Sequence, residues 1–334
     1  MNPAMQTGDQ GWTPPGLTMI QRTLPCFAVL LTASAFWLAA APAASAEPEQ
    51  IRQACTGKAL SPDDRISACS RLIDAKTETG HQLAIAYCNR GEALTEKHDF
   101  DRALTDLDEA VRLDPDFACP RLNRGRAYAL KGDLDRGIAE YDEAIRIDPN
   151  FALAYNNRGD AWFNKGDDAR AMADFDAAIK LDPKLAIAWG NRGFLHYRAH
   201  ALPQAIADYS EQIRLSPGVL AYINRGNAYR DSEQLDKAAA DYGAVTKLAP
   251  TDARGWRNRG VIRLFQGDNK GGIADYDKAL QYDPSDAASW NNRGQAKLRI
   301  GDKQGAIADY RKVLELEPDF KSARDILLRL GVKS

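Results

Sequence analysis

One tripeptide, Asn-Arg-Gly, recurs seven times along this chain of 334 residues, beginning at positions 89, 123, 157, 191, 224, 258 and 292. Successive copies are 34, 34, 34, 33, 34 and 34 residues apart. A period of this size is typical of a stack of small supersecondary units, each of which rests on its neighbours. The repeat therefore predicts an array rather than a domain with one central core, and it favours binding over chemistry.

Each unit carries further signals around the glycine of its tripeptide. An aromatic residue lies four positions before this glycine in six of the seven units, and Ala or Gly lies twelve positions after it. Leu, Tyr or Phe follows at sixteen positions, and a proline closes the unit. Gly-Asp pairs such as Gly132-Asp133 and Gly166-Asp167 stand between the two halves. This order predicts a helix, a short turn, a second helix and a proline that begins the next connection.

These residues resemble the tetratricopeptide repeat, whose pattern is Trp-x-x-Leu-Gly-x-x-Tyr followed by Ala, Phe and Pro. The resemblance implies an all-α fold, a right-handed α-solenoid of seven helix-turn-helix units. Expected unit bounds are 84–117, 118–151, 152–185, 186–218, 219–252, 253–286 and 287–320. We expect a degenerate helical cap over 47–83 and a capping helix over 321–334, because a terminal unit lacks a neighbour on one side.

The arginine of the tripeptide stands where the family usually has leucine, and it has a regular counterpart. An acid follows each arginine sixteen positions later, from Arg90 and Asp106 to Arg293 and Asp309. Both lie at matching heights in a folded hairpin, which predicts a ladder of partly buried arginine–carboxylate pairs, within a unit or between neighbours. A row of arginines gripping an anionic polymer is the alternative, and the matching acids argue against it. A second departure replaces the usual tyrosine three positions after the glycine: His196, Arg263 and Lys297.

The first 46 residues differ in kind from the array. They contain two charged residues, and an apolar run over 27–41 is followed by Ala44-Ser45-Ala46. This layout predicts a secretory signal peptide cleaved after Ala46, with Met19 as an alternative start of translation. The run is short for a membrane span, and no cysteine follows it in a lipid-attachment context. We therefore expect a secreted, periplasmic protein of bacterial type without stable membrane insertion after removal of the signal.

Four cysteines follow the signal region: Cys55, Cys69, Cys88 and Cys119. An even number in an oxidising compartment favours disulfides, and four cysteines allow three connectivities. We expect Cys55 and Cys69 to join the N-terminal cap. Cys88 and Cys119 lie in adjacent units on the same helix face, so they form either a second bridge or two free apolar side chains.

At 100° per residue, one stripe of each first helix is separate from the core-facing arc. This first-helix stripe consists of the residues at offsets −6, −3, +1, +4 and +5 from each repeat glycine. The resemblance implies that it lines an inner, concave groove that binds a partner; the plain alternative is packing between neighbouring first helices. Basic residues in the last three units favour a partner whose acidic end lies near Arg254 and Arg257. The candidate partner-binding residues are Leu153, Phe163, Ile187, Phe194, Tyr197, Arg230, Arg254, Arg257, Phe265 and Arg299.

Other signals restrict the function class. With 44 basic and 46 acidic residues, the chain lacks the net positive charge typical of nucleic-acid partners. No catalytic motif is present, and His196 and His200 have the spacing of metal ligands but no third ligand nearby. We expect no enzyme, no cofactor and no metal, but a scaffold that holds an extended peptide or helix of a partner protein. A glycan or peptidoglycan ligand and self-assembly into larger structures are the two alternatives.

Overall fold

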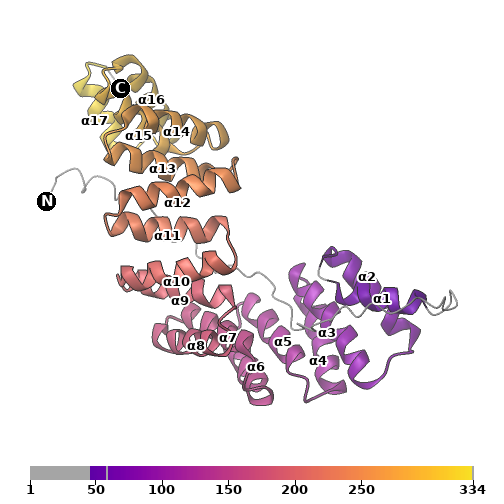
Figure 1. Ribbon diagram of the computed structural model, residues 1–334. Helices are drawn as coiled ribbons and strands as arrows, with labels where there is room; N and C mark the ends of the chain where they lie inside the picture. The colour runs from indigo at the N-terminus through magenta and orange to yellow at the C-terminus, as the bar shows by residue number, and fades with distance from the viewer. Residues whose placement is uncertain (1–45, 58, 333–334) are drawn as a thin grey trace, which may run out of the picture. The chain divides into compact units, whose positions relative to one another are not determined.

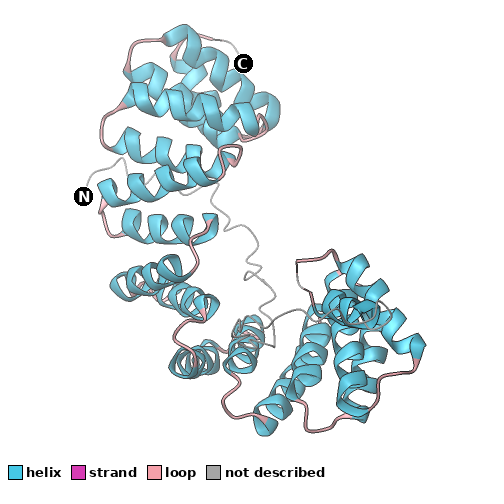
Figure 2. Cartoon of the chain, turned by 45° about the vertical axis from the view of Figure 1, so that its right-hand side comes forward, coloured by secondary structure: helices cyan, strands magenta, loops and turns pink. Residues whose placement is uncertain are grey.

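The chain is a succession of helices in a computed structural model that describes residues 46–57 and 59–332. Throughout these residues the elements are α-helices joined by short connections, without a strand (Figure 1, Figure 2). The predicted all-α class is thus confirmed. In chain order the helices are α1 (Ala46–Thr56), α2 (Pro62–Ala75), α3 (Gly80–Glu96), α4 (Phe100–Leu113), α5 (Ala118–Leu130), α6 (Leu134–Ile147), α7 (Ala152–Asn164), α8 (Asp168–Leu181), α9 (Ala186–Arg198), α10 (Leu202–Leu215), α11 (Val219–Asp231), α12 (Leu235–Leu248), α13 (Ala253–Phe265), α14 (Asn269–Tyr282), α15 (Ala287–Arg299), α16 (Lys303–Leu316) and α17 (Lys321–Arg329).

Consecutive helices pair into hairpins, as the repeat predicts. The first helix of a hairpin packs on its own second helix, as α3 does on α4 and α13 on α14. The second helix also contacts the first helix of the next hairpin, as α4 does with α5 and α12 with α13. Two compact units divide between Ala188 and Trp189, inside α9. Within each unit, packing between sequence neighbours gives the local, additive stability of repeat proteins.

The repeat glycine lets the two helices of a hairpin approach closely. A Cβ atom at Gly125 would lie 2.7 Å from Cε1 of Tyr141, and one at Gly226 would lie 2.8 Å from Cε1 of Tyr242. Both tyrosine rings are buried. The aromatic ring of the second helix therefore occupies the volume that a side chain on the first helix would need. This contact explains why the small and aromatic positions are sixteen residues apart.

The Gly-Asp turn has two functions. Gly132, Gly166, Gly267 and Gly301 have φ values between +83° and +93°, which are accessible to glycine and end the first helix. The following aspartate caps the second helix: Asp133 accepts from the Arg136 amide at 3.0 Å. Three hairpins lack the glycine, and there a residue with a Cβ adopts positive φ at the same place: His98, His200 and Glu233. His200 is therefore a turn residue.

The predicted arginine–carboxylate ladder is confirmed. In six hairpins the first-helix arginine donates from Nε and Nη2 to both oxygens of one second-helix aspartate, at 2.6–3.0 Å. Arg124 pairs instead with Glu140. The ladder aspartates are only 2–8% exposed. Contacts to the preceding hairpin, each at 2.6 Å, also occur: Arg124–Asp108, Arg158–Asp142 and Arg293–Asp277.

The three departures from the family tyrosine all reach the ladder. Nδ1 of His196 lies 2.9 Å from Asp208, Nη1 of Arg263 lies 3.0 Å from Asp275, and Nζ of Lys297 lies 2.9 Å from Asp309. In these hairpins a buried carboxylate is therefore contacted by a second basic side chain. Their place in the ladder gives these residues a structural role.

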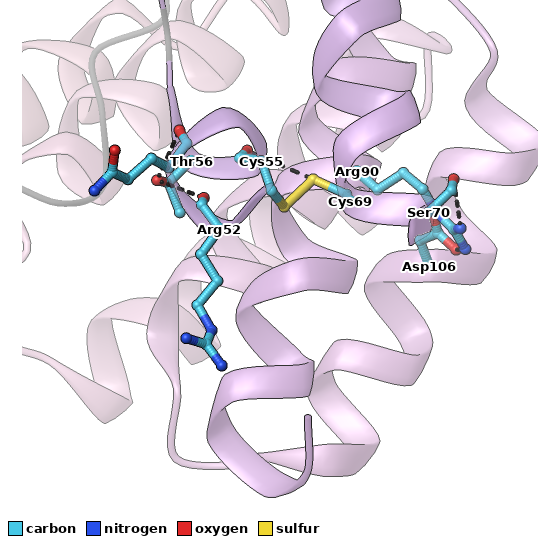
Figure 3. Close-up of a disulfide and its surroundings, with 8 residues drawn as sticks. Arg52, Cys55, Thr56, Cys69, Ser70, Arg90 and Asp106 are labelled. Carbon is cyan, nitrogen blue, oxygen red and sulfur yellow. Dashed lines mark hydrogen bonds and ion pairs between the residues drawn. A yellow bond between two sulfur atoms is a disulfide. The ribbon is translucent and has the colours of Figure 1, made fainter. Parts of the chain in front are cut away.

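A disulfide joins Cys55 of α1 to Cys69 of α2, as predicted (Figure 3). Both cysteines are buried beside Leu72 and Ala86, so the bridge lies in the small core of the N-terminal hairpin. Figure 3 also shows Arg90 of α3, which donates to Ser70 of α2 at 3.0 Å as well as to Asp106. The first arginine of the ladder, Arg90, is therefore also bonded to the N-terminal cap, through the Ser70 hydroxyl group.

The second pair of cysteines does not form a bridge. Cys88 and Cys119 are buried free thiols whose sulfur atoms lie 3.6 Å apart. The side-chain amide of Asn123 donates to the sulfur of Cys88 at 3.2 Å. Of the two arrangements that the sequence left open, the structure has the one without a second disulfide.

The two ends of the chain contain the expected signal region and the last helix, α17. The expected signal peptide and the alternative start at Met19 lie outside the described residues. At the other end, α17 buries Ala323 and Leu327 against the last hairpin, in a cluster with Tyr310 and Val313. No helix among the described residues combines the length and apolar character that a membrane span requires.

Candidate partner-binding site

The first helices of neighbouring hairpins adjoin, so their stripes form a shared face within each compact unit. In the N-terminal unit, α5 contacts both α3 and α7; in the C-terminal unit, α13 contacts α15. The exposure and bonding of each stripe residue then decide which side chains are available to a partner.

The predicted residues of the N-terminal unit are partly occupied by packing. Leu153, Phe163 and Ile187 are half-buried. Leu153 packs against the cluster that contains Leu122 and Tyr141. Packing between neighbouring helices, the plain alternative for this stripe, therefore accounts for Leu153.

In the C-terminal unit, Phe194 and Tyr197 also pack half-buried against a core cluster, which contains Tyr209. The Tyr197 hydroxyl donates to Oδ2 of Asp231 at 2.5 Å, and Nε of Arg230 donates to Oδ1 of the same carboxylate at 2.8 Å. Burial is the main cause that raises the pKa of the Tyr197 phenol. A partner would have to compete with these bonds for the polar atoms of Tyr197 and Arg230.

The remaining predicted arginines, Arg254, Arg257 and Arg299, are bonded within the chain. Arg254 forms a two-pronged bond with Asp252, the N-cap of α13, and this hydrogen bond lowers the pKa of Asp252. Arg257 lies 3.4 Å from Asp286, and Nη1 of Arg299 donates to the Leu264 carbonyl at 3.3 Å. An acidic partner at Arg254 or Arg257 would therefore displace an existing carboxylate.

Phe265 is the predicted residue whose ring is most available. It ends α13 and is 53% exposed. Ile300, which follows Arg299 at the end of α15, is exposed at 44%. The two apolar side chains lie at the ends of contacting first helices, and the Arg299 bond to Leu264 links the same ends.

Asp160 lies at stripe offset +1 on α7 and is not among the predicted residues. Its Oδ1 is buried and has no hydrogen-bond partner. Burial raises the pKa of this carboxyl to about 6. An acid on a stripe is usually solvated, so its residue type gave no signal; its position relative to the neighbouring helices produces the burial.

Comparisons with known proteins agree with this geometry. Tetratricopeptide repeat models match residues 84–117, 152–185, 223–280 and 287–320, and a TPR repeat model matches 125–166 and 262–301. Together these matches include more than half of the chain. A comparison with curated proteins found no match.

Several solved structures share the fold at low sequence identity. The C-terminal part of a TPR repeat-containing protein from Cytophaga hutchinsonii is 19% identical, with a TM-score of 0.58 over 71% of this chain and 98% of that one. PilF of Pseudomonas aeruginosa is 14% identical, with a TM-score of 0.55 over 64% and 97%. YrrB, described as a TPR protein with an unusual peptide-binding site, is 19% identical, with a TM-score of 0.51 over 56% and 96%. The repeat matches, the hairpin packing and these structures lead to one conclusion: the chain belongs to the tetratricopeptide repeat family.

Proposed function

We propose that this protein is a non-catalytic scaffold that holds a peptide or helical segment of a partner protein on its first-helix stripe. Tetratricopeptide repeats are typical of protein–protein interaction scaffolds, and YrrB has a peptide-binding site in a similar fold. The recurring arginines and carboxylates bond to one another in the ladder.

The exposure of Phe265 carries the proposal. An aromatic ring gains free energy when it leaves water, and exposed aromatic residues at the centre of a contact dominate binding energy in many interfaces. Phe265 lies on the first-helix stripe, for which the family resemblance implies a partner-binding role, and it is 53% exposed. Its neighbours Ile300 and Arg299 add apolar surface and a charge at the rim.

The proposed location is outside the cytoplasm. The signal-like segment over 27–46 of the sequence and the disulfide between Cys55 and Cys69 both support export, because structural disulfides persist in oxidising compartments.

Selection from a random dodecapeptide display library on the purified protein tests the proposal. Selected peptides should bind at least about thirtyfold more weakly to Phe265→Ala, because loss of a central aromatic contact costs about 2 kcal/mol or more. Leu248→Ala is the matched control: Leu248 is 54% exposed in the same unit, but on the second helix α12. Equal affinities of the two variants would contradict the site.

Phe265 suits this test better than Phe194 or Tyr197, because its exposed ring is not part of a core cluster with them. Phe194→Ala or Tyr197→Ala would remove side chains from a core cluster, so weaker binding could result from local unfolding. The same protein is titrated with peptidoglycan fragments and sized by light scattering. Fragment binding without peptide binding, or growth in mass with concentration, would replace the proposal with one of its two alternatives.

A further inference from the structure

Asp160 has a carboxylate group that folding leaves without a partner. Its buried Oδ1 accepts no hydrogen bond, and the residue uses only its backbone carbonyl, which accepts from Asn164 Nδ2 at 2.9 Å. The ladder aspartates are more deeply buried than the half-buried Asp160, but each is met by at least one guanidinium group. An unpaired buried carboxylate is costly, since the attraction of a counter-charge is what offsets desolvation.

The charges around Asp160 do not neutralise it. Burial is the main cause that raises the pKa of the Tyr141 phenol. The charge of Asp160 raises this pKa further, and the charge of Arg126 on α5 lowers it. Burial alone accounts for the raised pKa of Asp160, with no cation opposing it. Because that value is about 6, most Asp160 side chains are ionised at pH 7.

The environment of Asp160 favours an organic cation over other ligands. No group of three potential metal ligands occurs in the described part of the chain, so a metal ion would find a single carboxylate. Phe163 lies three positions further along α7, on the same side of the helix, and is half-buried. An aromatic face beside a carboxylate suits the aliphatic stem and charged head of a basic side chain.

We propose that Asp160 anchors one basic side chain, lysine or arginine, of the partner segment. This assignment rests on the proposed scaffold function and names the chemistry that its partner must supply. The ammonium or guanidinium group donates to the half-buried carboxylate, while the stem covers the Phe163 ring. A carboxylate at one fixed place on the stripe also sets the register of the bound segment.

A titration of the purified protein with small cations tests the site without any peptide. The Asp160 carboxyl carbon is followed by carbon-13 NMR from pH 3 to pH 8 and assigned with Asp160→Asn. With n-butylammonium or methylguanidinium chloride, its pKa should fall from about 6 toward the ordinary aspartate value of about 4. Sodium chloride at equal ionic strength should leave it near 6. The same pKa in all three salts would overturn the proposal.

A double-mutant cycle tests the same contact with a selected peptide. Asp160→Asn, or replacement of the peptide's lysine by norleucine or its arginine by citrulline, should each weaken binding about tenfold or more, and the two changes together little further. Asp116→Asn, the same charge change at an exposed loop residue of this unit, should have no effect. Additive losses would refute the contact.

The two arms separate the two proposals. If peptides are selected but their affinity is indifferent to Asp160, the anchor is wrong and the scaffold function stands. If the small cations lower the pKa of Asp160 but no peptide is selected, the cation site stands and the scaffold function fails.

Discussion

Replacing Asp275 by asparagine should destabilise the hairpin of α13 and α14 more than any neighbouring change of the same charge. The Asp275 side chain is 2% exposed and accepts from Arg259 at 2.6 Å and 2.9 Å. Nη1 of Arg263 lies 3.0 Å from the same carboxylate. An amide of nearly the same shape keeps the packing and removes the charge, so the change isolates the electrostatic contribution.

The size of the destabilisation depends on the hydrogen bonds that Arg259 and Arg263 keep after the Asp275 carboxylate is removed. Arg259 retains a bond to the Thr246 hydroxyl at 3.3 Å, and Arg263 retains the Gly271 carbonyl and a weak contact with Asp268 at 3.8 Å. Removing one partner of a buried pair costs about 3–5 kcal/mol, and the loss of a shared partner places Asp275→Asn in this range. Asp174→Asn should cost less, because Arg158 keeps Asp142 at 2.6 Å.

Amide hydrogen exchange is the appropriate assay, because an array of hairpins opens locally rather than in one step. The amides of α13 and α14 should lose protection by about 3 kcal/mol or more, and those of α3 to α6 should not change. Asp277→Asn is the control: this exposed acid lies two residues away, pairs with Arg293, and should cost less than about 1 kcal/mol. Equal loss from the two variants, or unchanged exchange in Asp275→Asn, would show that burial of the ladder does not govern its strength.

Three further outcomes can be measured. Reducing the disulfide, or replacing Cys55 and Cys69 by serine, should lower the protection of α1 and α2 by about 3 kcal/mol, the value expected for a loop of this length, in hydrogen exchange. Gly125→Ala should cost about 1–3 kcal/mol in urea unfolding because its Cβ meets the Tyr141 ring, whereas Gly243→Ala, whose nearest neighbour lies at 3.7 Å, should be neutral or gain up to about 1 kcal/mol. The pKa of Asp160 is higher in the folded chain than in the unfolded one, so the free energy of unfolding should fall by up to about 3 kcal/mol as the pH rises from 4 to 6. Urea unfolding across that range measures this slope, and Asp160→Asn should abolish it.

The sequence predicted those contacts that recur with the period. Arg158 and Asp174 are sixteen residues apart, as are the other pairs of the ladder, so one hairpin geometry brings each pair together. The Cys55–Cys69 bridge was predictable for another reason: two cysteines in a short segment without the repeat signature had few alternatives. Turns were predicted only where glycine marks them, and His98 and His200 show that the left-handed residue persists without it.

The availability of stripe residues was less predictable. Helical offsets give the direction of a side chain from its own helix axis, but burial depends on the neighbouring helices as well. Phe194 and Phe265 both lie on the stripe, yet Phe194 packs against a core cluster, whereas Phe265, at the last position of α13, is 53% exposed. Tyr197 likewise found a partner, Asp231, thirty-four residues away.

This difference between recurring and single residues bears on where a partner binds. A charge that recurs in each unit meets a recurring counter-charge, as Arg225 meets Asp241, and the fold itself uses both. The residue at offset +1 changes from unit to unit, as Glu92, Arg126, Asp160 and Phe194 show, so the period supplies no fixed counter-charge for Asp160. Its desolvation is then offset only if something outside the repeat provides the cation. In a chain built from near-identical units, the unpaired exceptions are therefore the places at which a particular partner segment is distinguished from others.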